Sequence, residues 1–256
     1  MSGRRLEHKV ALVSGAGGPM GGAVARRFAQ EGARLVVTDI SGARLHAFVQ
    51  EMIGEGIDAA RIVAARADVT KRDEALAVAE AGLDAFGRID ILANIVGGVR
   101  DATLYQPALT MGEARWDETF DRNLKGVLHL TQRLAPGMIE RGGGKILNVS
   151  SINYAGEAGN ADYGAAKAAV ASLTRTLAIE LAPSINVNCI VPGAIETRAM
   201  LKLSEAEKAG YRDRTLLKRL GQPGDIANAA LFLCGAEADF ITGHLLPVSG
   251  GVWPSL

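Results

Sequence analysis

Short apolar runs rich in β-branched residues alternate along the whole chain with longer amphipathic stretches, and this alternation limits the possible folds more than any other feature. The runs are VALVS (10–14), RLVVTD (34–39), RIVAA (61–65), IDILAN (89–94), KILNVSS (145–151), INVNCIV (185–191) and HLLPVSGG (244–251). Strands that alternate with helices form right-handed βαβ units. We therefore expect an α/β fold: a doubly wound, seven-stranded parallel sheet with helices on both faces.

The stretches between these runs carry helix signals. Thr70 with Asp73 and Ser204 with Glu207 have the spacing of capping boxes or nearly so, and each pair predicts the start of a helix. No linker, repeat or low-complexity segment interrupts the alternation, so we expect one domain over residues 1–256. The charged helix at 205–214 lies within the longest strand-free stretch, and the segment near 198–217 is a candidate flexible flap.

The composition excludes several classes of function. Lys plus Arg equals Asp plus Glu at 28 each, which gives no support to nucleic-acid binding. No apolar run approaches the ~18 residues of a membrane span, and the N-terminus lacks the apolar core of a signal peptide. The two cysteines lie in apolar stretches, and the histidines show no metal-ligand spacing. These features predict a soluble cytoplasmic protein without metal, nucleic-acid or membrane partners.

The turn after the first run, SGAGGPMGG (14–22), has the glycines of a phosphate-binding loop. Such glycines allow a tight turn and let the backbone approach a pyrophosphate at the N-terminus of the next helix. A structural glycine turn is about as consistent with this loop alone. Pro19 has no N–H to donate, but proline is favoured at the first helical position and keeps Gly18 extended. We therefore expect the amides of Met20 and Gly21 to take over its role.

Acidic residues follow the next two strands. Asp39 ends the second run, where a carboxylate can accept hydrogen bonds from the adenosine ribose hydroxyls and repels a 2′-phosphate. Neither Gly17, Gly18 nor Ile40 offers a basic side chain beside it. Asp68, in the sequence ADVT, could meet the adenine amino group. These residues favour NAD(H) as the cofactor, the alternative for Asp39 being a solvated residue at a strand end.

A Tyr-x-x-x-Lys pair stands on a predicted helix. Tyr163 and Lys167 are four residues apart, which places the phenol and the ammonium on one helical face. The strand before this helix ends in Ser150 and Ser151. Ligands of parallel sheets bind at the carboxyl ends of the strands, so we expect the serines, Tyr163 and the glycine loop to meet at one edge.

With these residues the chain resembles the short-chain dehydrogenase/reductase family over nearly its whole length. The ordered motifs that carry the resemblance are SGAGGPMG, Asp39, DV (68–69), ANIVG (93–97), WDETFDRNLKG (116–126), NVSS (148–151), YGAAK (163–167), VPGAIETRAM (191–200), RLGQPGDIANAALFL (219–233) and ITGHLLPVSGG (241–251). The resemblance implies a Rossmann-type dinucleotide-binding and catalytic domain. Two departures are Pro19 in place of a glycine, and Ile95 and Val96 in place of Asn and Ala. The second puts a hydrogen bond of the central sheet in doubt.

The resemblance also implies the site residues. The catalytic set is Asn123, Ser151, Tyr163 and Lys167, with Ser150 as the alternative serine and with Ser151, Asn153 and Tyr163 at the substrate. The implied cofactor-binding residues are Gly15, Gly18, Met20, Gly21, Asp39, Ile40, Asp68, Val69, Asn94, Gly97, Tyr163, Lys167, Pro192, Gly193, Ile195 and Thr197.

The chemistry expected of this set is hydride transfer between a nicotinamide and a carbinol carbon. A phenol with its ordinary pKa of ~10 is a weak base at neutral pH, so we expect Lys167 and the oxidised nicotinamide to lower the pKa of Tyr163. Ser151 would hold the substrate oxygen, Lys167 would also bridge the ribose hydroxyls, and Asn123 would order a water beside Lys167.

The expected substrate walls are residues 97–113, Ile152 to Tyr154, and Met200, Leu201, Leu203 and Tyr211 of the flap, and they are mostly apolar or aromatic. They favour a secondary alcohol or ketone, with a 3-oxoacyl thioester second and a sugar third. Arg100 could meet an acidic group. A non-catalytic NAD-binding sensor or scaffold is the alternative of another class. The small residues of the helix at 161–181 allow close helix packing, and the resemblance implies that this helix and the long helix at 114–140 pair with copies in other subunits, so we expect a homotetramer, or next a dimer.

Overall fold

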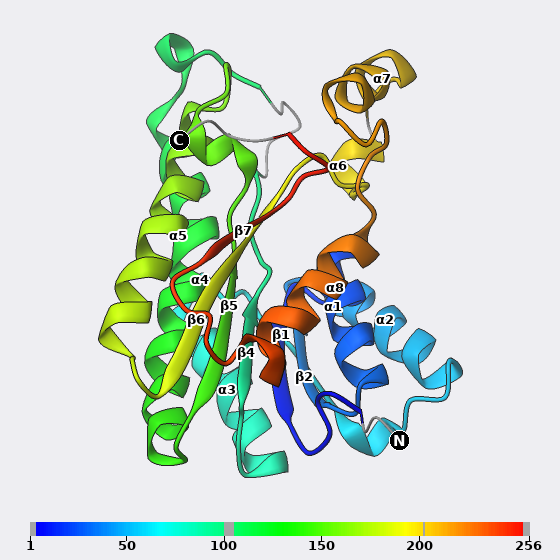
Figure 1. Ribbon diagram of the computed structural model, residues 1–256, viewed down its shortest axis with the longest axis vertical. Coiled ribbons are helices and arrows are strands. Elements are labelled where there is room, and N and C mark those ends of the chain that lie inside the picture. Colours follow the sequence, from blue (N-terminus) through cyan, green and yellow to red (C-terminus); the bar gives the residue numbers. More distant parts are fainter. Residues whose placement is uncertain (1–3, 100–104, 202, 253–256) are drawn as a thin grey trace.

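The protein is described here from a computed structural model, which places residues 4–99, 105–201 and 203–252. It contains a seven-stranded sheet in the order β3-β2-β1-β4-β5-β6-β7, and every neighbouring pair of strands is parallel (Figure 1). The strands are β1 (Val10–Ser14), β2 (Arg34–Asp39), β3 (Ile62–Arg66), β4 (Ile91–Asn94), β5 (Gly144–Val149), β6 (Ile185–Pro192) and β7 (Leu245–Val248). The predicted doubly wound α/β fold is confirmed.

Helices cover both faces of the sheet. One face packs against α1 (Pro19–Gln30), α2 (Gly42–Gly54) and α8 (Pro223–Cys234), and the other against α3 (Arg72–Phe86), α4 (Glu113–Glu140) and α5 (Ala161–Glu180). Each layer has its own apolar core, and the central strands are buried on both sides, as their unbroken apolar sequences require. The two short helices α6 (Arg198–Leu201) and α7 (Glu205–Arg214) project beyond the sheet (Figure 1).

Several predicted boundaries shift by one or two residues. The strand predicted at 61–65 begins at Ile62, because Arg61 closes a short 3₁₀ turn. The strand predicted at 145–151 ends at Val149, so both serines follow it. Ser204 and Glu207 form the predicted capping box of α7. The start predicted from Thr70 is wrong: Lys71 caps α3, because the Thr70 hydroxyl bonds the Asp68 carboxylate instead.

The carboxyl ends of the strands lie on the side of the sheet from which α6 and α7 project (Figure 1). The chain reverses its direction of winding between β1 and β4, which is where parallel sheets of this kind open a crevice. Among the described residues, no helix is long and apolar enough to cross a membrane.

Candidate active site

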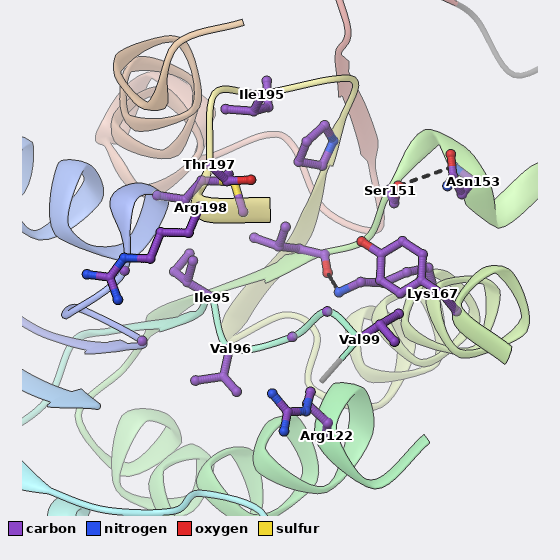
Figure 2. A pocket seen from close by; sticks show the side chains of 18 of the residues that line it. Ile95, Val96, Val99, Arg122, Ser151, Asn153, Lys167, Ile195, Thr197 and Arg198 are labelled. Atoms are coloured by element: carbon purple, nitrogen blue, oxygen red, sulfur yellow. Dashed lines mark hydrogen bonds between the residues drawn. The ribbon is translucent and has the colours of Figure 1, made fainter. Parts of the chain in front are cut away.

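A cavity of about 990 Å³ opens at the carboxyl ends of the strands. It is lined by residues from almost every strand end, by α1 and α5, and by the segment after β6. All but two of the predicted site residues line it: Gly15, Gly18, Met20, Gly21, Asp39, Ile40, Asp68, Val69, Gly97, Ser151, Asn153, Tyr163, Lys167, Pro192, Gly193, Ile195 and Thr197. Figure 2 shows Ser151 and Lys167 on one side of the cavity, and Thr197 and Arg198 on the other.

The glycine loop is shaped for close approach of a ligand. Gly15 has φ +72°, a left-handed conformation that glycine adopts without strain. A Cβ on Gly21 would lie 2.2 Å from the Gly15 carbonyl oxygen, so only glycine lets the helix begin so near the strand. Pro19 is the first residue of α1, and Gly18 before it is extended with φ −97° and ψ 161°. The expected helical position of Pro19 and the extended conformation of Gly18 are both confirmed, and the first residues of α1 line the cavity.

Asp39 ends β2 with its side chain only 6% exposed. Its Oδ1 atom accepts hydrogen bonds from the Ser41 amide at 2.8 Å and from Arg44 Nη2 at 2.6 Å. Gly17, Gly18 and Ile40 offer no basic side chain, as the sequence shows, but Arg44, which was not predicted, supplies one. Arg44 lies in the first turn of α2, which folds back over the strand end, and it lines the cavity too. Its spacing of five residues from Asp39 was the available sequence signal.

The end of β3 contributes a second polar corner. Asp68 Oδ1 accepts hydrogen bonds from the amide and the hydroxyl of Thr70, at 3.1 and 2.7 Å. The next residue, Val69, is buried, and its carbonyl oxygen lies 3.2 Å from Nδ1 of His129 on α4. Both residues border the cavity next to Ile40. Asp68 adds an acidic side chain and Val69 an apolar one to this corner of the cavity.

The structure separates the two serines after β5. Ser150 is buried, and its hydroxyl donates to the Lys167 carbonyl oxygen at 2.7 Å. Ser151 is only partly buried, accepts a hydrogen bond from the Asn153 amide at 3.2 Å, and interacts with the Tyr163 hydroxyl. Ser150 thus acts on the backbone of α5, whereas the hydroxyl of Ser151 lies beside the phenol.

Lys167 and Asn123 meet around Gly97. Lys167 is 3% exposed, and its Nζ donates to the Val149 carbonyl oxygen at 2.8 Å. Asn123 donates through Nδ2 to the Gly98 carbonyl at 3.0 Å and to the Thr119 carbonyl at 2.7 Å. A Cβ on Gly97 would lie 2.7 Å from both Lys167 Nζ and Asn123 Oδ1. The ammonium of Lys167 and the side-chain amide of Asn123 therefore both lie against Gly97. A larger residue at this position would displace them.

Burial sets the acid–base character of the pair. It lowers the pKa of Lys167 to about 8, and it raises the pKa of Tyr163 above its ordinary value. The hydrogen bond with Ser151 acts on the Tyr163 pKa in the opposite direction. The lower Tyr163 pKa that the sequence predicted is thus not a property of the protein alone. It requires a positive charge beside the phenol when the site is occupied.

Asn94 and Asn123 are the two predicted residues that do not line the cavity. Asn94 is 3% exposed and donates through Nδ2 to Asn148 Oδ1 at 2.9 Å, which joins β4 to β5. The sequence put one hydrogen bond of the central sheet in doubt, because Ile95 and Val96 stand in place of Asn and Ala. Backbone amides provide the link at this point instead. The amides of both residues donate to Ser14 Oγ, at 3.0 and 3.2 Å, so that β1 and β4 are tied at the point where the crevice opens.

The segment after β6 forms the opposite wall. Gly193 donates its amide to Val248 on β7, and a Cβ there would lie 2.8 Å from the Ser249 Cα atom. Ile195 is buried and pairs with Gly221, while Thr197 follows it at the cavity. These contacts hold the backbone of the segment against β7 and place Ile195 and Thr197 at the cavity, while their predicted contact with a nicotinamide stays a prediction.

The flap covers one end of the cavity. Met200, Leu203 and Tyr211 line it, as expected from sequence, whereas Leu201 is 69% exposed and, like Tyr154, does not line it. The hydroxyls of Tyr105 and Tyr211 are in contact, and burial raises the pKa of Tyr105. Arg100 lies outside the described residues. The arginines Arg44, Arg122, Arg198 and Arg214 also line the cavity and were not predicted.

Comparison with known proteins agrees with this geometry. Residues 15–253 match a family model described as enoyl-(acyl carrier protein) reductase. The chain is 39% identical over 247 residues to the (2S)-[(R)-hydroxy(phenyl)methyl]succinyl-CoA dehydrogenase subunit BbsD of Thauera aromatica, covering 96% of this chain and 97% of that protein. It is 40% identical over 250 residues to the 3-oxoacyl-[acyl-carrier-protein] reductase FabG of Thermotoga maritima, covering 97% of this chain and 99% of that protein.

Among solved structures, a 7α-hydroxysteroid dehydrogenase complexed with NADH and 7-oxo glycochenodeoxycholic acid superimposes with a TM-score of 0.90 at 36% identity, over 98% of this chain and 97% of that chain. The fold and the sequence place this protein among the α/β oxidoreductases. The chain belongs to the short-chain dehydrogenase/reductase family.

Proposed function

We propose that the protein interconverts a secondary alcohol and a ketone, with NAD(H) as its cofactor and Tyr163 as its acid–base group. The observation that carries this proposal is the placement of Ser151, Tyr163 and Lys167 in the same cavity as the glycine loop and Asp39. A dinucleotide is long enough to reach from one group to the other. The two relatives named above match this chain over nearly their whole length. We therefore assign the entire described chain to this one site.

The residues present fit a dinucleotide. The left-handed Gly15 and the glycine forced at position 21 provide the close backbone approach that a pyrophosphate needs. Asp39, Ile40, Asp68 and Val69 surround the place for adenosine, and Pro192, Gly193, Ile195 and Thr197 border the place for nicotinamide. When bound there, the nicotinamide supplies or accepts the hydride.

The chain's own residues orient the substrate and transfer the proton. Ser151 donates a hydrogen bond to the substrate oxygen and holds it beside the Tyr163 hydroxyl. The phenol gives its proton to that oxygen in reduction and takes it back in oxidation. Lys167, when protonated, favours the phenolate and contacts the ribose hydroxyls. Asn123, fixed by Gly98 and Thr119, positions a water beside Lys167 through which the proton reaches solvent.

Asp39 supports a preference for NAD(H). Both of its observed hydrogen bonds use Oδ1, which leaves Oδ2 to accept from the ribose hydroxyls. We therefore expect NADH to be preferred. Because Arg44 neutralises part of the charge that would repel a 2′-phosphate, we expect NADPH to be accepted as a weaker cofactor.

The walls around the Tyr163 hydroxyl support a largely apolar substrate. Met200 and Leu203 of the flap, Ile152 after β5 and the rings of Tyr105 and Tyr211 border that end of the cavity, with Asn153 as a polar contact. A cyclic or aliphatic secondary alcohol or ketone suits these side chains.

A 3-oxoacyl thioester is the second candidate. It is supported by the 40% identity to the Thermotoga maritima reductase that carries this substrate in its name. A thioester would also require an opening through which the rest of its carrier extends.

We further propose a cytoplasmic homotetramer. Both cysteines are buried and unpaired, as is usual for proteins of a reducing compartment. Apolar side chains stand exposed on α4 and α5, including Leu128 at 41%, Ile139 at 43% and Ile179 at 78%. A second pair of helices from another subunit would cover them.

Turnover of NADH with a panel of ketones and 3-oxoacyl thioesters tests the proposal. Reduction of cyclic or aliphatic ketones, with Tyr163→Phe inactive, supports it. Preference for the thioesters would support the second candidate. Tight NADH binding without turnover of any member would instead support a sensor or scaffold.

A further inference from the structure

Arg198 connects the flap to the glycine loop. It is the first residue of α6, directly after Thr197, and its Nη2 atom donates to the Gly17 carbonyl oxygen at 3.2 Å. Figure 2 shows its side chain extending from the segment that carries Thr197 toward the helices of the N-terminal half. The two contacting residues are 181 positions apart in the chain. A cation thus stands at the rim of the cavity directly beside the loop that fits a pyrophosphate.

The loop itself offers few donors and no charge. The Ala16 amide is bonded to the Thr38 carbonyl oxygen and the Gly18 amide to that of Gly15. Pro19 has no N–H at all. Residues 14–22 contain no basic side chain. The amides of Met20 and Gly21 have no acceptor within the helix, so they are the donors that remain for a group with two negative charges.

Three of the other cations that line the cavity are paired with carboxylates. Arg44 lies 2.6 Å from Asp39, Arg122 lies 3.4 Å from Glu118, and Arg214 lies 3.6 Å from Glu157. A fourth, Lys167, is buried and donates to the Val149 carbonyl. Arg198 differs from all of these. Within the described ranges it is exposed, has no carboxylate within ion-pair distance, and is held by one neutral carbonyl oxygen.

We propose that Arg198 is a cofactor-binding residue whose guanidinium binds the pyrophosphate over the Gly15–Gly21 loop. This inference rests on the proposed dinucleotide cofactor. A guanidinium forms two parallel hydrogen bonds to phosphate oxygens and supplies the charge that the loop lacks. It also replaces the donor that Pro19 removes. The Gly17 carbonyl oxygen holds the side chain near this position beforehand.

The position of Arg198 gives the contact a second effect. Because Arg198 begins α6, its bond to the pyrophosphate ties the flap to the cofactor rather than to the substrate. Cofactor binding alone should therefore hold the start of α6 against the glycine loop and slow proteolytic cleavage on this side of the cavity.

Calorimetric titration of Arg198→Gln with NADH, NADPH, ADP and adenosine tests the assignment. Glutamine keeps polarity and most of the length but removes the charge and the forked donors. We expect the affinities for NADH, NADPH and ADP to fall alike, by about tenfold, and that for adenosine to stay unchanged. Arg198→Lys should recover part of the loss. Arg212→Gln is the matched control, because Arg212 lies on the same flap, pairs with Glu205 at 3.6 Å and does not line the cavity.

Limited proteolysis provides a readout that is independent of affinity. At saturating NADH, cleavage within 198–217 should be slowed in the unchanged protein and in Arg212→Gln, but much less in Arg198→Gln. Unchanged NADH affinity in Arg198→Gln would overturn the inference while leaving the proposed function intact. A loss confined to NADPH would assign the guanidinium to the 2′-phosphate and overturn it as well. Failure of the unchanged protein to bind NADH would remove the proposed function itself.

Discussion

Arg44 Nη2 and Asp39 Oδ1 lie 2.6 Å apart, and both residues of this ion pair line the cavity, at the position that we propose for the adenosine ribose of a cofactor. The carboxylate is almost fully buried, whereas the guanidinium is 37% exposed. The acidic member disfavours a 2′-phosphate and the basic member favours one. The choice of cofactor therefore depends on how strongly each holds the other.

Removal of the carboxylate should reverse this balance. In Asp39→Ala the guanidinium of Arg44 is released, and we expect kcat/KM with NADPH to rise relative to NADH by about tenfold or more. Steady-state kinetics with both cofactors measures the ratio. Asp39→Ala combined with Arg44→Gln is the control, and it should lose NADH preference without gaining NADPH. Equal kcat/KM for the two cofactors in the unchanged protein would contradict the proposed preference.

Replacement of Tyr163 by phenylalanine should abolish most activity. The change removes one oxygen and almost no volume, and a positioned proton donor contributes about 10²–10⁴-fold in rate. We expect kcat to fall by at least that order, with NADH affinity nearly unchanged. Because burial raises the pKa of Tyr163, the oxidation rate of the unchanged enzyme should rise with pH as the phenol ionises. A variant that keeps more than a tenth of the turnover would exclude Tyr163 as the acid–base group.

Lys167 should affect both the rate and the pH dependence of stability. Lys167→Met is expected to lower kcat and also to weaken cofactor binding, because we propose that the ammonium contacts the ribose. In the folded protein its pKa is lowered from 10.5 to about 8. Between these values the unfolded chain holds a proton that the folded protein has lost, so the contribution of Lys167 to the free energy of unfolding rises with pH. The buried thiols of Cys189 and Cys234, whose pKa values burial raises to about 12, act in the opposite direction above pH 9. Chemical denaturation at pH 7.5, 9 and 10 should therefore show the Lys167 contribution as a difference: stability should fall more with pH, or rise less, in Lys167→Met than in the unchanged protein.

The two neighbouring serines should separate into one that acts on the substrate and one that acts on the fold. Ser151→Ala removes a donor to the substrate oxygen, and we expect kcat/KM to fall by about 10²-fold with unfolding unchanged. Ser150→Ala removes the buried bond to the Lys167 carbonyl, and we expect a loss of about 1–2 kcal/mol in stability. Kinetics and thermal unfolding of both variants measure the contrast. The opposite pattern would assign the substrate oxygen to Ser150.

The exposed apolar residues of α4 and α5 predict assembly. We expect a D₂ tetramer by light scattering at micromolar concentration, since such surfaces favour closed symmetric contacts. Ile179→Glu places a charge on the most exposed of these positions and should shift the mass toward a dimer or monomer. Leu109→Glu is the matched control, because Leu109 is equally apolar and fully exposed but lies outside both helices. A monomeric mass of the unchanged protein would refute the assembly.

The sequence was sufficient to predict the fold from its local patterns, because the apolar runs located every strand of the described chain. Most of the residues that line the cavity were implied by the resemblance to the family, and strand-end reasoning alone located only the glycine loop, Asp39, Asp68 and the two serines. The sequence was not sufficient for contacts made across the fold. Arg44 reaches Asp39 only because α2 folds back over β2, and Arg198 reaches Gly17 across most of the chain. The choice between Ser150 and Ser151 likewise depends on where β5 ends, which a propensity pattern leaves open by a residue or two.

The strand order has a consequence for engineering the protein. Asp39 ends β2 and Ser151 lies just beyond the end of β5, and β1 and β4 lie between these strands. At ~4.8 Å per strand spacing the two strands are about 14 Å apart, beyond the range at which substitutions usually couple. Changes that retarget the cofactor and changes that retarget the substrate should therefore combine additively. Variants with altered cofactor specificity and variants with altered substrate specificity can be selected from separate libraries, and their substitutions can then be combined.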